Sequence, residues 1–339
     1  MITAPHPRDV LFEDGDPTTT LPVCDHYSGV EARMRKSLEL QAELGPVFDV
    51  TLDGEDGARV GGEVEHAHLI AELVQSPANR FDRVGARIVP HGHAAFAPML
   101  EVLLREAGTR LAYLMIPKPR DAADFEAAVH AVDLASRTVG LAREVPLHAL
   151  VETHGALRDV ELLAAHPRLE SLSFGLMDFV SAHRGAIPQT AMSAEGQFTH
   201  PLVARAKLAI AAACHGHAKT PSHCVVTEFK DTRLLQRAAE RACGEFGYTR
   251  MWSIHPDQVR VIVDAFAPTA AEVDLAVEVI MAAQAAEWGP IRHRHNGREH
   301  LHDRASYRYF WHIIERAQRT SMGGHAQLPA EARVRWFAH

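Results

Sequence analysis

The sequence predicts an α/β protein, a (β/α)₈ TIM barrel with a C-terminal helical extension. From about residue 20 onward, short β-branched or apolar runs alternate with longer segments of helical periodicity, which is typical of repeated βα units and a parallel sheet. Eight such runs can be counted, and eight parallel strands close a barrel. The 339 residues leave room for a barrel of about 250 residues and an appendage.

The eight short apolar runs are the expected strands. They cover residues 20–26, 46–54, 86–90, 111–118, 146–152, 169–175, 223–229 and 248–256. All strands of this architecture run parallel, so their carboxyl ends would meet on one face of the barrel.

Helices are expected between the strands, where apolar residues recur three and four positions apart. Clear examples are residues 30–44, 122–138 and 231–246. Asp231 can cap the last of these helices. Thr269 and Glu272 form a capping-box pattern that opens a further helix through about residue 287. These helices would surround the barrel.

The main irregular stretch between strands is residues 178–200, which are rich in Gly, Ser, Thr and Pro, and we expect an active-site loop there. We place residues 1–287 in the barrel catalytic domain and residues 288–339 in the C-terminal extension. The extension is basic and aromatic, with a helix expected from about residue 304 to 320. We interpret it as a capping segment or subunit contact, with direct participation in the active site as the alternative.

Composition and charge argue against several classes of function. The formal net charge of -8, with no long basic block, argues against a nucleic-acid partner. No apolar run approaches the roughly 18 residues of a membrane span, and the first residues lack the layout of a signal peptide. We therefore expect no membrane association and a cytoplasmic location. Reduced thiols without CxxC spacing are expected at Cys24, Cys214, Cys224 and Cys243.

Polar side chains at the ends of the expected strands are the candidates for chemistry, because the active site of this architecture lies at the carboxyl ends of the strands. Those positions are Asp53, Glu55, Asp56, Arg87, Lys118, Glu152, Asp178, Ser253 and His255.

Glu152 and Asp178 follow neighbouring strands and stand 26 positions apart, so they can meet on one cation. Magnesium suits two carboxylates, because it retains waters and accepts oxygen ligands from a substrate. The alternative is that each carboxylate only caps the helix that follows it.

The acidic residues 53–56 need a cation or a guanidinium nearby, because like charges at close range raise each other's pKa. We expect one of these acids, Asp53, to face solvent. Arg87 has a fixed fork of donors that suits a carboxylate or a developing oxyanion, and a salt bridge at the edge of the core is its alternative role.

Seven short strings carry a resemblance to a known family. They are ARMRKSL (32–38), GEDGA (54–58), ARIVP (86–90), IPKP (116–119), LVETHGAL (150–157), FGLMDF (174–179) and SIHPDQV (253–259). In this order and spacing, across roughly residues 30–285, the chain resembles the citrate lyase β-subunit-like family, which includes malyl-CoA and related acyl-CoA lyases.

The resemblance implies roles for particular residues. Glu152 and Asp178 match the magnesium ligands, with manganese as a possible substitute, and Arg87 matches the arginine that binds substrate and stabilises charge. Glu55 and Asp56 match the acidic pair that orders water at the metal. Lys36 matches the lysine after the first strand and is assigned to binding of the cofactor, a coenzyme A thioester. A homo-oligomer, a trimer or a hexamer, is also implied.

The sequence departs from the family at several places. Val89 stands where the family has an asparagine, and LPVCDHYSG replaces an N-terminal Phe-Val-Pro-Gly signature. Family members often carry an aspartate in a C-terminal Gly-x-x-x-Asp element that reaches a neighbouring subunit's site. The candidate here is Asp303 after Gly297, at a different spacing, and we assign it a catalytic role by resemblance alone.

The implied reaction is a Claisen-type formation or cleavage of the carbon–carbon bond between an acyl thioester and a 2-oxo acid. A metal-dependent 2-oxo acid aldolase without a thioester and a non-catalytic metabolite-binding paralogue are the alternatives. The proton could be moved by Asp303, by a hydroxide on the metal, or by His26 or His255. Pairs of histidines two positions apart could bind zinc, but this spacing matches known zinc sites poorly. The pairs are His91/His93, His215/His217, His293/His295 and His300/His302.

Overall fold

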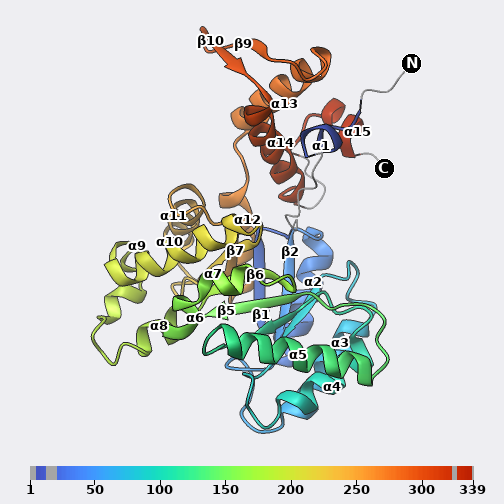
Figure 1. The fold of residues 1–339 in the computed structure, drawn as a ribbon, viewed down its shortest axis with the longest axis vertical. Coiled ribbons are helices and arrows are strands. Elements are labelled where there is room, and N and C mark those ends of the chain that lie inside the picture. The colour runs from blue at the N-terminus through green and yellow to red at the C-terminus, as the bar shows by residue number, and fades with distance from the viewer. Residues whose placement is uncertain (1–4, 13–20, 323–326, 338–339) are drawn as a thin grey trace. The chain divides into compact units, whose positions relative to one another are not determined.

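The computed structural model describes residues 5–12, 21–322 and 327–337 (Figure 1). Contacts within the chain define a barrel unit, Thr18–Phe266, and a second unit made of Met1–Pro17 and Ala267–His339. The sequence-based division places residues 267–287 with the barrel, whereas here they pack with the C-terminal helices.

The barrel unit is built on eight strands, as predicted. They pair in sequence order, every pair is parallel, and β8 closes the ring against β1. The strands are β1 (Cys24–Ser28), β2 (Phe48–Asp53), β3 (Val84–Arg87), β4 (Leu114–Ile116), β5 (Leu147–Val151), β6 (Leu169–Phe174), β7 (Thr220–His223) and β8 (Arg250–Ser253). The chain is therefore a (β/α)₈ TIM barrel.

Helices cover the outside of the barrel (Figure 1). They are α2 (Glu31–Leu44), α3 (Glu63–Gln75), α4 (Phe96–Ala107), α5 (Ala122–Thr138), α6 (His154–Arg158), α7 (Val160–Ala164), α8 (Leu176–Ser181), α9 (Gly196–Thr199), α10 (Pro201–Gly216), α11 (Thr232–Gly244) and α12 (Pro256–Phe266). The Asp231 carboxylate accepts from the Leu234 amide, which confirms the predicted cap. Across the described ranges, no helix combines the length and the apolar character that crossing a bilayer demands.

The predicted position of the seventh strand was wrong. We expected residues 223–229, whereas β7 is Thr220–His223 and contains Pro221. Proline cannot donate to a ladder and argues against a strand in sequence reasoning. Here its carbonyl still accepts from the Thr249 amide at 3.4 Å. The buried residues from 224 to 226 follow the strand as irregular chain at its carboxyl end.

One further sequence expectation differs from the structure. The stretch 178–200 is not wholly irregular, because it contains the end of α8, a short 3₁₀ helix η1 (Gln189–Met192) and α9. Thr20, which opens the expected first strand, lies outside the described residues.

A fully buried ion network fills the barrel interior near its amino-terminal end. Arg250 lies 2.5 Å from Asp49 and 3.2 Å from Asp25. The Thr51 hydroxyl donates to Asp25 at 2.7 Å, and the Tyr113 hydroxyl donates to the same carboxylate at 3.0 Å. Charges of both signs and their hydrogen bonds are buried together, which reduces the cost of removing them from water.

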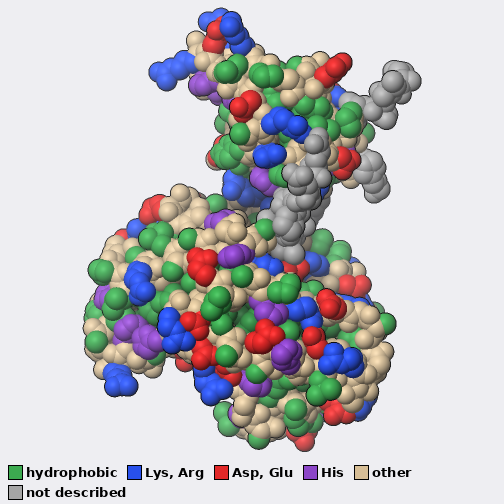
Figure 2. Space-filling model, viewed as in Figure 1, with side chains coloured by type: hydrophobic (Ala, Val, Ile, Leu, Met, Phe, Trp, Pro, Cys, Tyr) green, Lys and Arg blue, Asp and Glu red, His purple; other side chains and the backbone are tan. Residues whose placement is uncertain are grey.

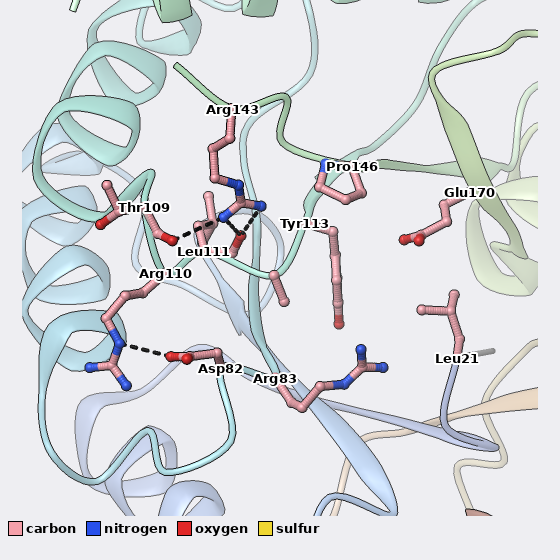
Figure 3. Close-up of a pocket in the computed structure, with 11 residues that line it drawn as sticks. Leu21, Asp82, Arg83, Thr109, Arg110, Leu111, Tyr113, Arg143, Pro146 and Glu170 are labelled. Atoms are coloured by element: carbon pink, nitrogen blue, oxygen red, sulfur yellow. Dashed lines mark hydrogen bonds and ion pairs between the residues drawn. The ribbon is translucent and has the colours of Figure 1, made fainter. Parts of the chain in front are cut away.

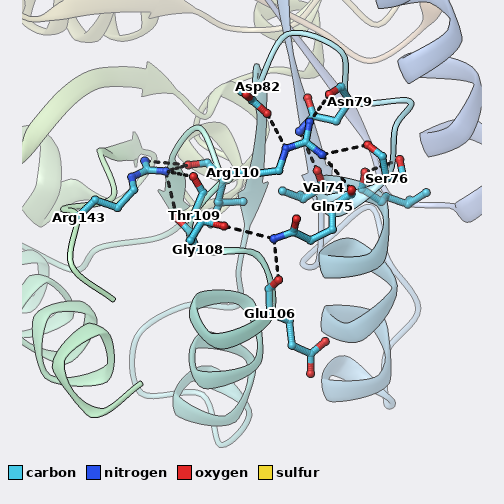
Figure 4. Close-up of polar contacts among 12 residues, drawn as sticks. Val74, Gln75, Ser76, Asn79, Asp82, Glu106, Gly108, Thr109, Arg110 and Arg143 are labelled. Atoms are coloured by element: carbon cyan, nitrogen blue, oxygen red, sulfur yellow. Dashed lines mark hydrogen bonds and ion pairs between the residues drawn. The ribbon is translucent and has the colours of Figure 1, made fainter. Parts of the chain in front are cut away.

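Arginines also tie together the loops at the amino ends of the strands (Figure 4). Arg110 donates to carbonyls of residues 75, 76 and 79 and pairs with Asp82 at 2.8 Å. Arg143 donates to carbonyls of residues 108, 109 and 111. Both guanidinium groups therefore hold loops in place, a stabilising role typical of this face.

A pocket of ≈ 220 Å³ opens between these loops (Figure 3). Arg83 and Glu170 point toward it beside the Tyr113 ring. Arg83 pairs with Asp49 at 2.8 Å and so belongs to the same ion network. The pocket lies at the opposite end of the strands from the candidate active site described below.

The second unit has its own apolar core. It contains α1 (Pro7–Leu11), α13 (Ala270–Ala285), β9 (Ile291–His295), β10 (Arg298–His302), α14 (Arg304–Arg319) and α15 (Ala330–Phe337). Trp311 of α14 is fully buried and packs against Trp336 of α15, with ring centroids 5.6 Å apart. Thr269 and Glu272 form the predicted capping box at the start of α13.

Substitution of Gly85 by alanine is expected to destabilise the barrel. A Cβ at this position would lie 2.3 Å from the Tyr113 ring, which is stacked on His148 and cannot move freely. Overpacking of this kind costs about 1–3 kcal/mol. Urea unfolding followed by circular dichroism should show the loss. Gly216→Ala is the matched control, because a Cβ there meets nothing within 4 Å. Equal stability of the two variants would contradict the packing argument.

Candidate active site

A buried ion pair between Arg87 and Asp53 stands at the carboxyl ends of β3 and β2. Arg87 Nε and Nη2 donate to the two Asp53 oxygens at 2.7 and 2.5 Å. The same carboxylate accepts from the amides of Glu55 at 3.0 Å and Gly57 at 2.9 Å. A Cβ on residue 57 would lie 2.2 Å from Asp53 Oδ2, so this turn requires glycine. Asp53 thus fixes both the arginine and the loop that follows β2.

That loop presents Glu55 and Asp56 to Lys118. Lys118 Nζ lies 2.6 Å from Glu55 Oε1 and 2.7 Å from Asp56 Oδ2, and it approaches Asp178 Oδ1 at 3.9 Å. Arg87 Nη1 also lies 3.0 Å from Glu55 Oε2. The predicted need for cations beside the acidic loop is therefore met by Arg87 and Lys118.

The pKa values of the two loop carboxylates shift in opposite directions. Burial raises the pKa of Glu55, despite the opposing charge of Arg87. Burial also acts to raise the pKa of Asp56, but the hydrogen bond and charge of Lys118 outweigh it and lower that pKa. Two neighbouring acids with separated pKa values are suited to different roles in proton transfer.

Lys118 adopts a left-handed backbone conformation, with φ of 49°, between Pro117 and Pro119. Non-glycine residues rarely adopt this conformation, and its cost is about 1–3 kcal/mol. The conformation lets the Lys118 amide donate to Glu152 Oε1 at 2.9 Å while its ammonium group reaches the acidic loop. One residue thereby links the ends of β2, β4 and β5.

Glu152 follows β5 directly and is 3% exposed. Its side chain lies against Gly175, directly after β6, where an added Cβ would be 2.3 Å from Glu152 Oε2. Burial, and next the charge of Asp178, raises the pKa of Glu152 well above its ordinary value. Asp178 lies in the first turn of α8 with 46% of its side chain exposed. The two carboxylates are thus close enough for the charge of Asp178 to act on Glu152.

The Glu152 and Asp178 pair fits a divalent cation. A buried carboxylate whose pKa is raised by a second carboxylate gains most from a cation between them. Among the described residues, no three His, Cys, Asp or Glu side chains converge as a closed metal cage. Two carboxylates that leave the other positions to water and substrate suit magnesium.

Aromatic side chains form the floor below Arg87. Its guanidinium carbon lies 5.4 Å from the Tyr27 ring centre and 5.5 Å from that of Trp252. His26 Nδ1 lies 3.0 Å from the Ser253 hydroxyl, and burial lowers the pKa of His26 to about 4. His26 is therefore neutral at pH 7.

A second pocket, of ≈ 300 Å³, adjoins this cluster at the carboxyl end of the barrel. Met177, next to Asp178, lines it together with residues of η1 and the segment after β7. The expected active-site loop, residues 178–200, thus contributes Gln189, Thr190, Met192 and Ser193 to its wall.

The structure brings five of the predicted site residues together: Arg87, Glu55, Asp56, Glu152 and Asp178. Lys36 lies elsewhere, exposed on α2 and paired with Glu39 at 3.0 Å. Asp303 caps α14 in the second unit, where its carboxylate accepts from the amides of Ala305 and Ser306. Roles in binding or catalysis for Lys36 and Asp303 stay predictions.

Sequence reasoning misjudged two residues of the cluster. Asp53 was expected to face solvent, but it is 3% exposed, because its carboxylate turns inward to Arg87 and the loop amides. The exposed member is Asp56, at 57% of its side chain. Lys118 was noted only as a strand end and received no role. Its position between two prolines at a strand end was the available signal.

Acidic and basic side chains are interspersed over the visible face of the barrel unit (Figure 2).

Comparison with solved structures finds close similarity to a citrate lyase from Burkholderia xenovorans LB400. It is 52% identical, has a TM-score of 0.83, and the match covers 98% of this chain and 100% of that one. The protein CitE from Mycobacterium tuberculosis, in complex with magnesium, acetoacetate and coenzyme A, is 21% identical with a TM-score of 0.66. That match covers 88% of this chain and 98% of the other, and it shows the shared fold alone.

Among curated proteins, an L-malyl-CoA/β-methylmalyl-CoA lyase from Cereibacter sphaeroides is 33% identical over 195 residues. The aligned part is 55% of this chain and spans 61% of that relative's length. No family model matches the sequence.

Replacement of Glu152 by glutamine should stabilise the metal-free protein at neutral pH. The raised pKa means that the folded protein binds the Glu152 proton more tightly than the unfolded chain does, so ionised Glu152 costs stability. This cost is absent below the pKa of glutamate in the unfolded chain, about 4.3, and it grows as pH rises above that value. Each unit by which the pKa of Glu152 in the folded protein exceeds its pKa in the unfolded chain adds about 1.4 kcal/mol to the full cost. Urea unfolding in EDTA at several pH values measures it.

The expected result is a gain for Glu152→Gln that shrinks as pH falls from 7 toward 5. Glu299→Gln, which changes an exposed glutamate, is the control and should show no such trend. A Glu152→Gln variant no more stable than the parent at pH 7 would argue against a raised pKa of Glu152 in the folded protein.

Proposed function

Because the chain belongs to the citrate lyase β-subunit-like family, we propose that it is a carbon–carbon lyase that acts on a β-hydroxyacyl thioester with the help of magnesium. The observation that carries the proposal is the Glu152 and Asp178 pair beside Lys118 and Arg87, at the carboxyl ends of the barrel strands. The similarity to the B. xenovorans citrate lyase over the whole chain supports it.

The proposed substrates are a thioester such as citryl-, malyl- or citramalyl-CoA and the 2-oxo acid released from it or added to form it. In the cleavage direction the β-hydroxyl loses its proton, the carbon–carbon bond breaks, and the thioester takes up the electron pair as an enolate. Protonation of that enolate yields the shorter acyl thioester. In the other direction the enolate attacks the 2-oxo carbonyl.

Glu152 and Asp178 would hold Mg²⁺, for which Mn²⁺ is a possible substitute. A bound divalent cation supplies a Lewis acid that polarises the oxygen atoms of a 2-oxo acid. The family resemblance suggested this pair, and the buried carboxylate with a raised pKa supports it. The CitE complex with magnesium, at lower identity, is consistent with it.

Arg87 would stabilise the negative charge that develops on oxygen during the reaction. The bidentate contact with Asp53 fixes its guanidinium, so little reorganisation is needed when charge appears. The positive charge of Arg87 acts to lower the pKa of Glu152, but burial raises that pKa by more. Arg87 would therefore lie close to the anionic oxygen of a substrate held beside Glu152.

Glu55, Asp56 and Lys118 would control water and protons at the site. Lys118 bridges the two acids, and their pKa values are shifted apart, that of Glu55 upward and that of Asp56 downward. At neutral pH Asp56 keeps its charge, whereas Glu55 is the better group to hold a proton. We assign proton transfer near the substrate to Glu55 and ordering of water to Asp56.

Other features of the function stay predictions. Lys36 would contact the coenzyme A carrier from the exposed face of α2. The second unit would contribute Asp303 to a neighbouring subunit in a trimer or hexamer. A cytoplasmic location is expected from the sequence.

Loss of Glu152 should abolish most turnover. We expect Glu152→Ala to reduce kcat by roughly a hundredfold or more, the effect of removing an essential electrostatic contact. The assay incubates the protein in excess magnesium with malyl-, citramalyl-, β-methylmalyl- and citryl-thioesters and with the matching free acids, and detects the released 2-oxo acid. Glu240→Ala, on the exposed face of α11, is the control.

The same assay separates the alternatives. Release from thioesters alone supports the proposed lyase, release from free acids indicates an aldolase, and no release indicates a binding protein. Near-normal turnover of Glu152→Ala in excess magnesium would refute the metal assignment.

Arg87→Lys should reduce kcat by at least about tenfold and leave magnesium affinity nearly unchanged. Lysine keeps the charge but cannot make the two parallel bonds to Asp53, so the charge is no longer fixed. Steady-state kinetics and a magnesium titration of activity measure the two quantities. An unchanged kcat would show that the bidentate geometry is not used in the reaction.

A further inference from the structure

The hairpin formed by β9 and β10 carries four histidines on one face. Residues two apart on a strand share a face, and so do residues paired directly across two antiparallel strands. His293 pairs with His300, and His302 pairs with Ile291. His293 and His295 of β9 therefore share a face with His300 and His302 of β10. Figure 1 shows this hairpin projecting from the helices of the second unit.

Three of these rings form a triangle at the base of the hairpin. The ring centroids of His293 and His302 are 6.0 Å apart, those of His300 and His302 are 6.2 Å apart, and His293 and His300 are directly paired. Two imidazoles on one tetrahedral zinc, with Zn–N bonds of about 2.0–2.1 Å, have ring centres roughly 5 Å apart. Rotation of the side chains can cover the remaining distance of about 1 Å.

The ring of His293 has the surroundings of an oriented metal ligand. Its Nε2 lies 3.4 Å from Oε2 of Glu278 on α13. Its Nδ1 is buried and, within the part of the chain that the structure describes, has no hydrogen-bond partner. A carboxylate on one ring nitrogen fixes the ring and leaves the other nitrogen to a cation, the usual arrangement around metal-bound histidine.

The base of the hairpin is sheltered by α14. The Tyr307 hydroxyl donates to the His302 carbonyl at 3.1 Å, and the His302 ring lies 5.3 Å from the Phe310 ring. The His293 side chain is only 15% exposed. His300 is exposed, so an ion can reach the triangle from solvent on that side.

The arginines of the hairpin lie away from the triangle. Arg292 and Arg294 alternate with His293 along β9 and so belong to the opposite face. Arg298 shares the histidine face but pairs with His295 near the turn. The charged group that contacts His293 is the Glu278 carboxylate, which favours a cation.

We propose that His293, His300 and His302 form a binding site for a divalent transition-metal ion of the zinc class. Neutral imidazole is a preferred ligand of zinc, copper and nickel, whereas magnesium prefers oxygen ligands. Among the described residues these side chains do not yet converge on one point, so the ion draws them together. The site lies in the second unit and does not depend on the proposed lyase function.

Zinc titration of the full-length, metal-free protein tests the proposal. Isothermal titration calorimetry in millimolar magnesium, which occupies oxygen sites, should show about one zinc ion per chain. Cobalt(II) in place of zinc should give the visible absorption of a four-coordinate ion with nitrogen ligands. His300→Ala removes a ligand at an exposed position, where the fold is least affected, and should weaken zinc binding by roughly tenfold or more. His293→Gln should do the same.

The control replaces His215 and His217, another His-x-His pair at the end of α10, by alanine. It should bind zinc as the parent does. The proposal is overturned if the parent binds no zinc near one equivalent, if both hairpin variants bind it as tightly as the parent, or if the control alone loses it.

Discussion

The bidentate ion pair between Arg87 and Asp53 holds the candidate site together. Burying a guanidinium and a carboxylate is costly unless their remaining hydrogen-bonding capacity is used. Here the Asp53 oxygens also accept from two amides of the loop after β2, so the pair sets the path of that loop. Through the loop it places Glu55 and Asp56 against Lys118. The positions of Glu55, Asp56 and Lys118 thus depend on the ion pair between Arg87 and Asp53.

Charge at the site is arranged in two layers. Below lies the neutral aromatic floor of Tyr27 and Trp252, which limits water under Arg87. The other layer consists of acids and cations joined by ion pairs, in the order Asp53, Arg87, Glu55 and Lys118. The buried Glu152 completes this layer at an energetic cost that a bound cation would relieve. Such a site is less stable empty than occupied, a common compromise between stability and function.

The sequence predicted the parts of the fold and site that depend on local pattern. Alternating apolar runs and helical periodicity predicted the barrel. The positions of the strand ends predicted that Arg87, Glu152 and Asp178 belong to the site. Three-dimensional detail decided the rest. Pro221 argued against β7, and no local pattern says that Asp53 and Glu55 turn inward to Arg87 while Asp56 stays exposed. The β9–β10 hairpin went unpredicted because polar residues occupy both of its faces.

The close approach of Glu152 and Gly175 restricts which residues can occupy two positions that directly follow neighbouring strands. The Glu152 carboxylate fills the space that any side chain at position 175 would need. A larger residue at 175 is compatible only with a smaller or displaced residue at 152. Position 175 therefore stays glycine as long as Glu152 is kept, so a glycine three residues before the aspartate is expected in related chains that keep the acidic pair.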